Sequence, residues 1–355
     1  MSPPDPVPEF LPGVDLARLF YLEAVRPLLG DLPHIAARVG PGSDVLGYDS
    51  PRSTDHDWGP RLDLFLPGDN SALNDRLRHE LPKRFLGWPT HFEPPGARVR
   101  SMADTDGPVD HYVLISELPA WTRSKLGFDP AGTITVDDWL STPWQRFAEV
   151  TGGAVFHDPH GELTGIRERL RWYPDDLWRY MLACQWTRIG QEEAFVGRTA
   201  EAGDDLGSRI LTARLCRDLA RLFLLQTRSF PPYAKWLGTS IRTDPAAGLL
   251  TSALRAATPE AREAALCAAY EEAGTRQNTL GLSDTVPAVR RTFFERGYAV
   301  IDAGRYAESL RAALTEPALA QRPLTGSIDQ ICDNTDVLEQ PERCRRLFGL
   351  PHLTE

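Results

Sequence analysis

The spacing of apolar residues changes character along this 355-residue chain, and that change limits the possible folds more than any other feature. Before about residue 139, short apolar segments alternate with turn-forming glycines and prolines, which favours a small sheet. Beyond it, apolar residues recur with helical spacing over 139–150, 174–195, 206–228, 259–273, 288–298 and 306–314. We therefore expect an α+β fold, with a small mixed-sheet domain over 1–138 and an α-helical bundle domain over 139–355.

The first part of the chain predicts a few short elements. Apolar residues over 16–29 recur helically, and 34–39 predicts a strand that ends in a tight turn. Leu62, Leu64 and Leu66 would share one face of a strand over 54–66, which Gly59-Pro60 would kink or bulge. A helix over 72–85, capped by Ser71, and strands over 88–92 and 111–116 would complete the domain.

Composition and charge rank the possible partners. The formal net charge is −10, which opposes non-specific binding to a nucleic-acid backbone and favours a small-molecule acceptor. No apolar run approaches the roughly 20 residues of a membrane span, and no secretory leader pattern opens the sequence, so we expect a cytoplasmic protein. The five cysteines never occur as Cys-x-x-Cys, which argues against a disulfide framework or a zinc site.

The segment GSDVLGYDSPRSTDHDWG, residues 42–59, carries the pattern closest to chemistry. Its Gly-Ser turn is followed after eleven residues by Asp55-His56-Asp57. In a strand, residues two apart point to the same face, so we expect the carboxylates of Asp55 and Asp57 to meet. Their repulsion is relieved by a raised pKa or by a hard divalent cation. The pattern therefore predicts a Mg²⁺ site on Asp55 and Asp57, which would also be the catalytic residues.

The turn at Gly42 and Ser43 suits phosphate binding. A glycine lets the backbone approach a ligand closely, and amide N–H groups with the serine hydroxyl can hold phosphate oxygens. Arg52 or Arg61 would add charge-assisted contacts. The alternative interpretation is that the two aspartates cap a loop and that Gly42-Ser43 is an ordinary turn.

The spacing and order of this segment resemble the signature of the nucleotidyltransferase superfamily. Together, GSDVLGYDSPRSTDHDWGPR, DLGSRI, PPYAKWLG and GSIDQICDNTD resemble a family of bacterial nucleotidyltransferase-like proteins of unassigned function. The resemblance implies an N-terminal nucleotidyltransferase domain and a C-terminal helical domain similar to those of aminoglycoside nucleotidyltransferases. The wider superfamily has a third carboxylate on a later strand, for which Glu93, Asp110 and Glu117 are the candidates.

The helical part offers weaker candidates. In PPYAKWLG, Tyr233 and Trp236 could stack a base, and Lys235 could neutralise a phosphate or act as a base; a packing corner is the alternative. A helical stripe could meet a triphosphate but is more typical of a solvated face that pairs with acids; it holds Arg214, Arg217, Arg221 and Arg228. A second stripe predicts core: Trp178, Leu182, Trp186 and Ile189.

Three functions remain in competition. The first is a magnesium-dependent enzyme that transfers a nucleoside monophosphate from an NTP, by default ATP, to a small-molecule acceptor. The second is a catalytically silent nucleotide-binding or regulatory protein with the same fold, which a missing third acid would favour. The third is an RNA-directed transferase, which the acidic charge balance disfavours.

Overall fold

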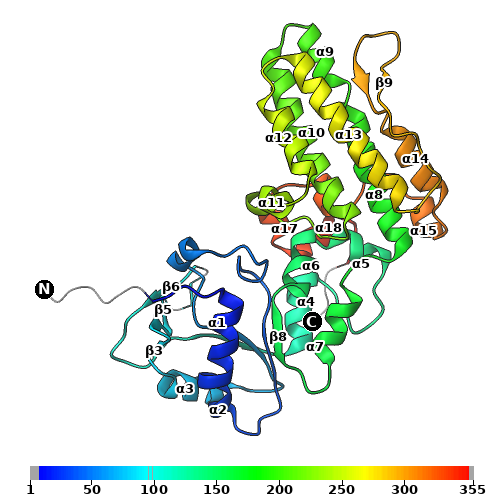
Figure 1. The fold of residues 1–355 in the computed structure, drawn as a ribbon. Helices are drawn as coiled ribbons and strands as arrows, with labels where there is room; N and C mark the ends of the chain where they lie inside the picture. The colour runs from blue at the N-terminus through cyan, green and yellow to red at the C-terminus, as the bar shows by residue number, and fades with distance from the viewer. Residues whose placement is uncertain (1–7, 95, 98, 352–355) are drawn as a thin grey trace, which may run out of the picture. The chain divides into compact units, whose positions relative to one another are not determined.

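The computed structural model describes residues 8–94, 96–97 and 99–351, shown in Figure 1. These residues form two compact units. The first holds the described residues up to 134 together with 146–171, and the second holds 135–145 together with those from 172 onwards. Where a single boundary after residue 138 was expected, the chain passes between the units three times.

A four-stranded mixed sheet forms the centre of the first unit, with the strand order β7-β2-β1-β8. Its strands are β1 (Ile35–Arg38), β2 (Arg61–Phe65), β7 (Tyr112–Ser116) and β8 (Ala154–His157). β1 pairs antiparallel with both β2 and β8, whereas β2 and β7 run parallel. Every residue of β1 and β2 is buried. The sheet is mixed, as expected, but β8 lies in the part of the chain where only helices were expected.

Helices cover this sheet. The N-terminal helical run was predicted over 16–29 and is continuous, with a π-helical middle: α1 (Gly13–Phe20), η1 (Tyr21–Val25) and α2 (Arg26–Leu29). Leu16, Phe20 and Val25 pack from this run into the core against Leu62 and Leu64 of β2. The other helices of the unit are α3 (Ser71–Glu80), α4 (Leu118–Leu126), α6 (Trp144–Thr151), which begins in the second unit, and α7 (Glu162–Arg169).

Three expectations for the first unit are wrong. The strand expected over 54–66 begins only at Arg61, and the preceding residues form a short 3-10 helix, η2 (Pro51–Asp55), closed by a capping box between Ser50 and Ser53. The strand expected over 88–92 splits between two small hairpins outside the main sheet: β3 (Arg84–Phe85) with β4 (Trp88–Pro89), and β5 (His91–Glu93) with β6 (Ser101–Ala103). The N-cap of α3 is Asn70 rather than Ser71.

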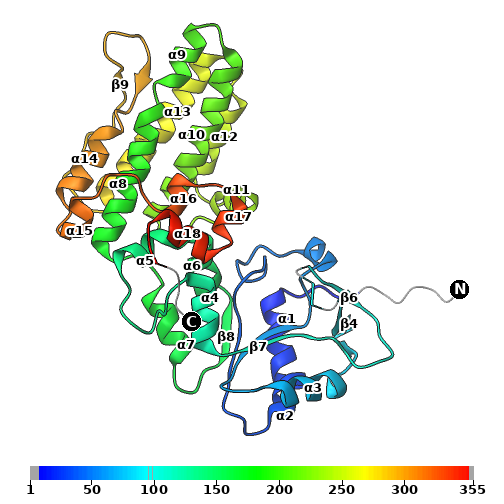
Figure 2. The ribbon, with the colours of Figure 1, turned by 180° about the vertical axis from the view of Figure 1, so that it is seen from behind.

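Among its described residues, the second unit contains helices and one hairpin. The long helices α8 (Asp175–Glu192), α10 (Asp205–Gln226) and α13 (Pro259–Thr279) lie side by side in Figures 1 and 2. Shorter helices surround them: α5 (Val136–Ser141), α9 (Phe195–Glu201), α11 (Ala234–Ile241), α12 (Ala246–Arg255), α14 (Gly304–Ala312), α15 (Pro317–Ala320), α16 (Ile328–Ile331), α17 (Thr335–Leu338) and α18 (Pro341–Leu347). The helix expected over 288–298 is wrong, because β9 (Arg291–Thr292) and β10 (Ala299–Val300) pair there.

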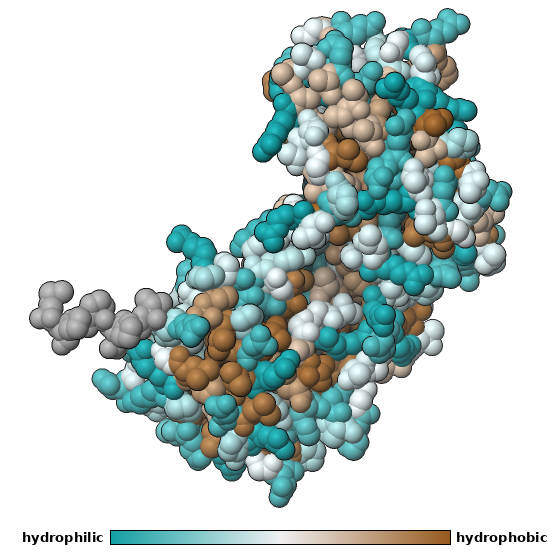
Figure 3. All heavy atoms as spheres, viewed as in Figure 1, coloured by the Kyte–Doolittle hydropathy of each residue, from teal (hydrophilic) through white to brown (hydrophobic). Residues whose placement is uncertain are grey.

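The cores and surfaces follow the apolar spacing. Trp178, Leu182, Trp186 and Ile189 are each at most 2% exposed, so their stripe is confirmed as core. All five cysteines are free thiols. In Figure 3, apolar side chains gather over the N-terminal helical run. Leu22 of η1 is 43% exposed. Within the described residues, none of the helices combines the length and apolar character needed to cross a membrane.

Candidate functional site

Strand pairing brings three chemically interesting segments to one edge of the sheet. Because β1 and β2 are antiparallel, the end of β1 lies beside the start of β2. Because β2 and β7 are parallel, their starts share that edge. The Gly42-Ser43 turn follows β1, the Asp55–Asp57 segment precedes β2, and Asp110 precedes β7. This edge is the candidate site.

Arg38, the last residue of β1, fixes the shape of the Gly-Ser turn. Its side chain is 1% exposed, and it donates from Nε to Asp44 Oδ2 at 2.7 Å and from Nη2 to Asp44 Oδ1 at 2.9 Å. It also donates to the carbonyl oxygens of Val39 and Pro41 at 2.8 and 2.9 Å. Burial alone would lower the pKa of Arg38, but Asp44 and then Asp63 raise it above its usual value. The turn is therefore held by a buried, fully charged guanidinium.

Asp63 belongs to the same cluster and escaped the sequence reasoning. It lies in the middle of β2, is 3% exposed, and accepts a hydrogen bond from the Val39 amide at 3.1 Å. Its Oδ2 is 3.5 Å from Arg38 Nη1. Burial raises the pKa of Asp63, with Arg38 acting in the opposite direction. The signal that could have found it is a carboxylate in the centre of an apolar strand, since such a group is buried only with a partner.

Gly42 has no room for a side chain. A Cβ there would collide with the Asp44 carboxylate and the Arg38 guanidinium, and φ is +154°. We expect Gly42→Ala to lower the free energy of unfolding by about 1–3 kcal/mol, because the turn must strain or the ion pair must shift. Urea unfolding followed by circular dichroism measures it. Gly47→Ala is the matched control, since Gly47 lies in the same loop at φ +71° with nothing within 4 Å. Equal losses in the two variants would contradict the steric argument.

Asp55 and Asp57 lie at the edge, but alternation along a strand does not orient them. Asp55 ends η2 with its side chain 56% exposed, and its Oδ1 is 3.0 Å from Nδ1 of His56. Asp57 has a left-handed backbone, with φ +48°. Its Oδ1 accepts hydrogen bonds from the Arg100 amide at 3.1 Å and from the Tyr112 hydroxyl at 3.2 Å. The strand that was predicted to bring the two carboxylates together is therefore wrong, whereas their capacity to bind a cation stays a prediction.

Two buried arginines surround Asp57. Arg61 is 4% exposed and donates from Nη1 to the Asp57 carbonyl oxygen, and its Cζ lies 4.2 Å from the Tyr112 ring centroid. Arg100 is 7% exposed, and its Cζ lies 5.0 Å from the same centroid. Burial, and then nearby Arg38, lowers the pKa of Arg61. Sequence reasoning named Arg61 for phosphate contacts but missed Arg100, because 93–106 has no periodicity to mark a buried residue. It also missed Tyr112, the first residue of β7.

Asp110 is the third-acid candidate at this edge. Its side chain is 29% exposed, and its Oδ2 is 3.0 Å from Arg100 Nη2. Glu117 follows β7, at the opposite end of that strand, and accepts from the Gly68 amide at 3.0 Å. Glu93 ends β5, outside the main sheet, where its Oε1 is 3.2 Å from His91 Nε2. Of the three candidates, Asp110 is therefore the one that shares the edge with Asp57.

The carboxylates at this edge suit a cation that keeps most of its bound water molecules. Across the part of the chain that the structure describes, no group of three or more His, Cys, Asp or Glu side chains is placed to hold a metal ion. Mg²⁺ is commonly bound through one or two carboxylates and several waters. Within the same residues, Asp57 Oδ2 accepts no hydrogen bond, so it is available as a ligand, and Asp55 is exposed nearby in sequence. Asp57, together with Asp55, is therefore the carboxylate that would hold such a cation.

Lys235 and the arginine stripe belong to the second unit. Lys235 is exposed on α11, and its Nζ lies 4.8 Å from the Trp236 ring centroid. The stripe arginines are engaged within their own unit: Arg214 with Glu192 at 2.8 Å, Arg217 with Asp333 at 3.3 Å, Arg221 over the Trp144 ring at 5.4 Å, and Arg228 with Asp175 at 4.0 Å. These contacts favour the interpretation of the stripe as a face that pairs with acids.

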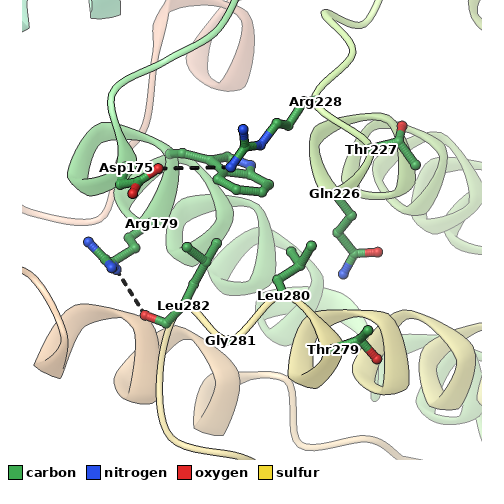
Figure 4. A pocket seen from close by; sticks show the side chains of 10 residues that line it. Asp175, Arg179, Gln226, Thr227, Arg228, Thr279, Leu280, Gly281 and Leu282 are labelled. Carbon is green, nitrogen blue, oxygen red and sulfur yellow. Dashed lines mark hydrogen bonds and ion pairs between the residues drawn. The ribbon is translucent and has the colours of Figure 1, made fainter.

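A depression of about 540 Å³ opens in the second unit beside α8 (Figure 4). Arg228 lies over the Trp178 ring at 4.5 Å and faces Asp175. Arg179 donates to the Leu282 carbonyl oxygen at 2.9 Å and to Asp176 at 2.6 Å. The charged groups that line the depression therefore have partners within the unit, and we assign it no ligand.

Comparisons of the sequence and of the structure with known proteins do not assign a role to these residues. A family model described as a domain of unknown function (DUF4037) matches residues 139–237, outside the 42–59 segment. No curated protein matches the sequence significantly. A crystal structure of a nucleotidyltransferase-like protein from Exiguobacterium sibiricum 255-15 is similar over 76% of this chain and 77% of that one, at 14% identity and a TM-score of 0.33. That likeness is too distant to carry an argument.

Proposed function

We propose that this chain is a magnesium-dependent nucleotidyltransferase that transfers a nucleoside monophosphate from an NTP to a small-molecule acceptor. One observation carries the proposal: the pairing of β1, β2 and β7 brings the Gly42-Ser43 turn, Asp57 and Asp110 to one sheet edge. A phosphate-binding turn beside carboxylates is the pairing that nucleotidyl transfer requires, since the triphosphate and its cation must be held together.

Each residue has a defined task in this proposal. The amides of the Gly42-Ser43 turn and the Ser43 hydroxyl hold the outer phosphates, and Asp55 and Asp57 hold the cation through oxygen. Mg²⁺ supplies neutralisation of phosphate charge when it is bound. A hydroxyl oxygen of the acceptor forms a bond to the α-phosphorus while the bond to the bridging oxygen breaks. The hydroxyl proton passes to solvent, and pyrophosphate leaves. Lys235 remains a proposed phosphate contact, and ATP the default donor.

A second function has one observation in its favour. Asp110, the third-acid candidate, faces Arg100 at 3.0 Å, so its carboxylate balances a buried guanidinium rather than standing open to an acceptor. A chain that binds nucleotide without turning it over would show the same arrangement. Pyrophosphate release distinguishes the two, because a silent binding protein is stabilised by an NTP but releases none with any acceptor. RNA-directed transfer remains disfavoured by the net charge of −10.

We expect one NTP with Mg²⁺ to stabilise the full chain, by roughly 2.7 kcal/mol at a hundredfold excess over its dissociation constant, because the ligand binds only the folded state. The Asp55→Ala, Asp57→Ala double variant should lose this gain. Thermal unfolding with each of the four NTPs, with and without Mg²⁺, measures it. The change in stability on adding the NTP is compared within each protein. The double variant also loses the two hydrogen bonds that Asp57 accepts, which alters its stability before any nucleotide is added.

The control is a second Asp-x-Asp pair in the same unit. Asp104 and Asp106 are both exposed, and the contact of Asp104 is a surface ion pair with Arg84 at 2.9 Å. Asp104→Ala, Asp106→Ala should keep the full NTP shift. The proposal fails if no NTP stabilises the parent at millimolar concentration, or if the Asp55, Asp57 variant responds as the parent does.

A further inference from the structure

We propose that Arg100 takes the place of a second divalent cation at this edge, so that the site binds one metal ion through Asp57 and Asp55 and none through Asp110. The inference rests on the proposed function, because it concerns the metal content of the same site. Four features of the residues around Arg100 support it.

The Arg100 guanidinium is fixed in place. Its side chain is 8% exposed, and Nη2 donates to the carbonyl oxygens of Phe92 at 2.7 Å and Asp110 at 2.9 Å. Nη1 donates to the carbonyl oxygen of His111 at 3.4 Å. Moving the guanidinium away would leave these carbonyls without their donor and a buried charge without acceptors, which is costly. The positive charge is therefore a permanent part of the edge.

This fixed charge neutralises Asp110. Arg100 Nη2 lies 3.0 Å from Asp110 Oδ2, an oxygen that is buried and has no hydrogen bond of its own among the described residues. A divalent cation on that oxygen would sit within a few ångströms of the guanidinium, in a region that water reaches poorly, so the two positive charges would repel strongly. The geometry thus uses Asp110 as a counter-charge for Arg100.

The main chain of Arg100 prepares Asp57 for a single ion. The Arg100 amide and the Tyr112 hydroxyl both donate to Oδ1 of Asp57, at 3.1 and 3.2 Å. These two hydrogen bonds occupy Oδ1 and orient the carboxylate. Carboxylates that bind metal ions are usually oriented by hydrogen bonds of this kind. The other oxygen, Oδ2, remains for one cation. Arg100 therefore connects the two carboxylates, with its amide on Asp57 and its guanidinium beside Asp110.

A second buried cation limits the charge that the edge can accept. Arg61 is 4% exposed, and its guanidinium donates to the Asp57 carbonyl oxygen. Both guanidinium groups lie against the Tyr112 ring, at 4.2 and 5.0 Å from its centroid. Two fixed positive charges thus already face the segment that precedes β2. Asp55 and Asp57 supply the charge for one divalent ion, and a second ion at Asp110 would leave the edge with an excess of positive charge.

Counting bound Mn²⁺ on the full chain tests the inference without relying on activity. Electron paramagnetic resonance of free Mn²⁺ gives the number of ions bound, alone and with one equivalent of a non-hydrolysable analogue of the stabilising NTP. We expect one Mn²⁺ per chain. Two ions would overturn the inference and leave the proposed function standing. Binding of no ion would overturn the proposed function and this inference with it.

Matched variants decide which carboxylate is a ligand. Asp57→Asn should raise the dissociation constant of Mn²⁺ by at least roughly tenfold, since loss of even an indirect partner costs that much. Asp110→Asn should leave both the stoichiometry and the dissociation constant nearly unchanged. If Asp110→Asn weakens Mn²⁺ binding as much as Asp57→Asn does, Asp110 is a ligand and the inference fails.

Replacing Arg100 tests whether its guanidinium keeps a second ion from binding. Arg100→Met frees the Asp110 carboxylate, so a second, weaker Mn²⁺ ion should bind, whereas Arg100→Lys keeps the charge and should bind one. Arg84→Met is the matched control, because Arg84 pairs with Asp104 at 2.9 Å on the surface of the same unit. An Arg100→Met protein that folds, by circular dichroism, and still binds one ion contradicts the inference; if it does not fold, the Asp110→Asn result decides.

Discussion

Arg38→Met is expected to lower the free energy of unfolding by about 3–5 kcal/mol, the loss typical of a buried ion pair that loses one partner. Methionine fills much of the same space but cannot compensate Asp44 and Asp63, which are 6% and 3% exposed. The carbonyl oxygens of Val39 and Pro41 also lose their donor. The Gly-Ser turn should loosen with the ion pair, so any stabilisation by an NTP should weaken in the same variant.

Urea unfolding of the full chain, followed by circular dichroism, measures this loss. Arg123→Met is the control, because Arg123 and Asp129 are 3.7 Å apart and nearly half exposed, and such surface pairs contribute about 0–1 kcal/mol. The loss at Arg38 should shrink as the pH falls, because burial raises the pKa of Asp63 and protonation of that carboxyl removes its uncompensated charge. A loss that equals the control, or that grows in acid, would show that Arg38 does not compensate these carboxylates.

Trp186→Ala is expected to destabilise the second unit by roughly 3–5 kcal/mol, as for other large aromatic residues cut back to alanine in a core. Trp186 is fully buried, and its ring stacks on that of Tyr306 at 4.3 Å between centroids. Its Nε1 also donates to Oε1 of Gln277 at 3.0 Å. The variant therefore leaves both a cavity and a buried amide oxygen without a donor.

The same urea experiment measures this change, with Leu206→Ala as the control. Leu206 is 69% exposed on α10, so its truncation should alter the free energy of unfolding by no more than about 0.5 kcal/mol. Trp186 would be shown to lie outside the cooperative core if both variants unfolded at the same urea concentration. Because the chain has two units, separate transitions are to be fitted separately.

Long helices could be predicted from the sequence, and short elements could not. The apolar spacing over 206–228 predicts α10 almost to its ends at Asp205 and Gln226, because many residues repeat the same period. Over 288–298 the segment is short, and its aromatic residues and Gly297 suit a hairpin as well as a helix. The pairing of Thr292 with Ala299 decided the outcome, and pairing is not a local property.

The residue types of the candidate site could be predicted from the sequence, but the contacts between them could not. The residue types over 42–59 indicate the chemistry, but the strand that should orient Asp55 and Asp57 starts later, since Pro60 has no amide for the sheet. The contact of Arg100 with Asp57 joins residues 43 positions apart. No periodicity marks such a contact in advance. Whether Asp55 and Asp57 bind a metal ion remains a prediction.

The late position of β8 has a consequence for synthesis of the chain. β8 pairs with β1 through Ala36 to Arg38, yet it follows β1 by more than a hundred residues. While the ribosome makes the intervening segment, that edge of β1 is an unpaired strand edge, which is a template for aggregation. The first unit can therefore complete its sheet only after residue 157 emerges, and long-range pairings of this kind form slowly.

The same feature limits how the chain can be divided. A fragment cut after residue 138 keeps the Gly-Ser turn and the aspartates but lacks β8 and the carbonyl of Glu149, which accepts from the Gly40 amide at 2.8 Å. A fragment cut at residues 139 and 237 carries β8 away from its partner strand. Neither is a natural piece of the protein. Dissection, fusion or tagging should therefore keep β1 and β8 in one chain.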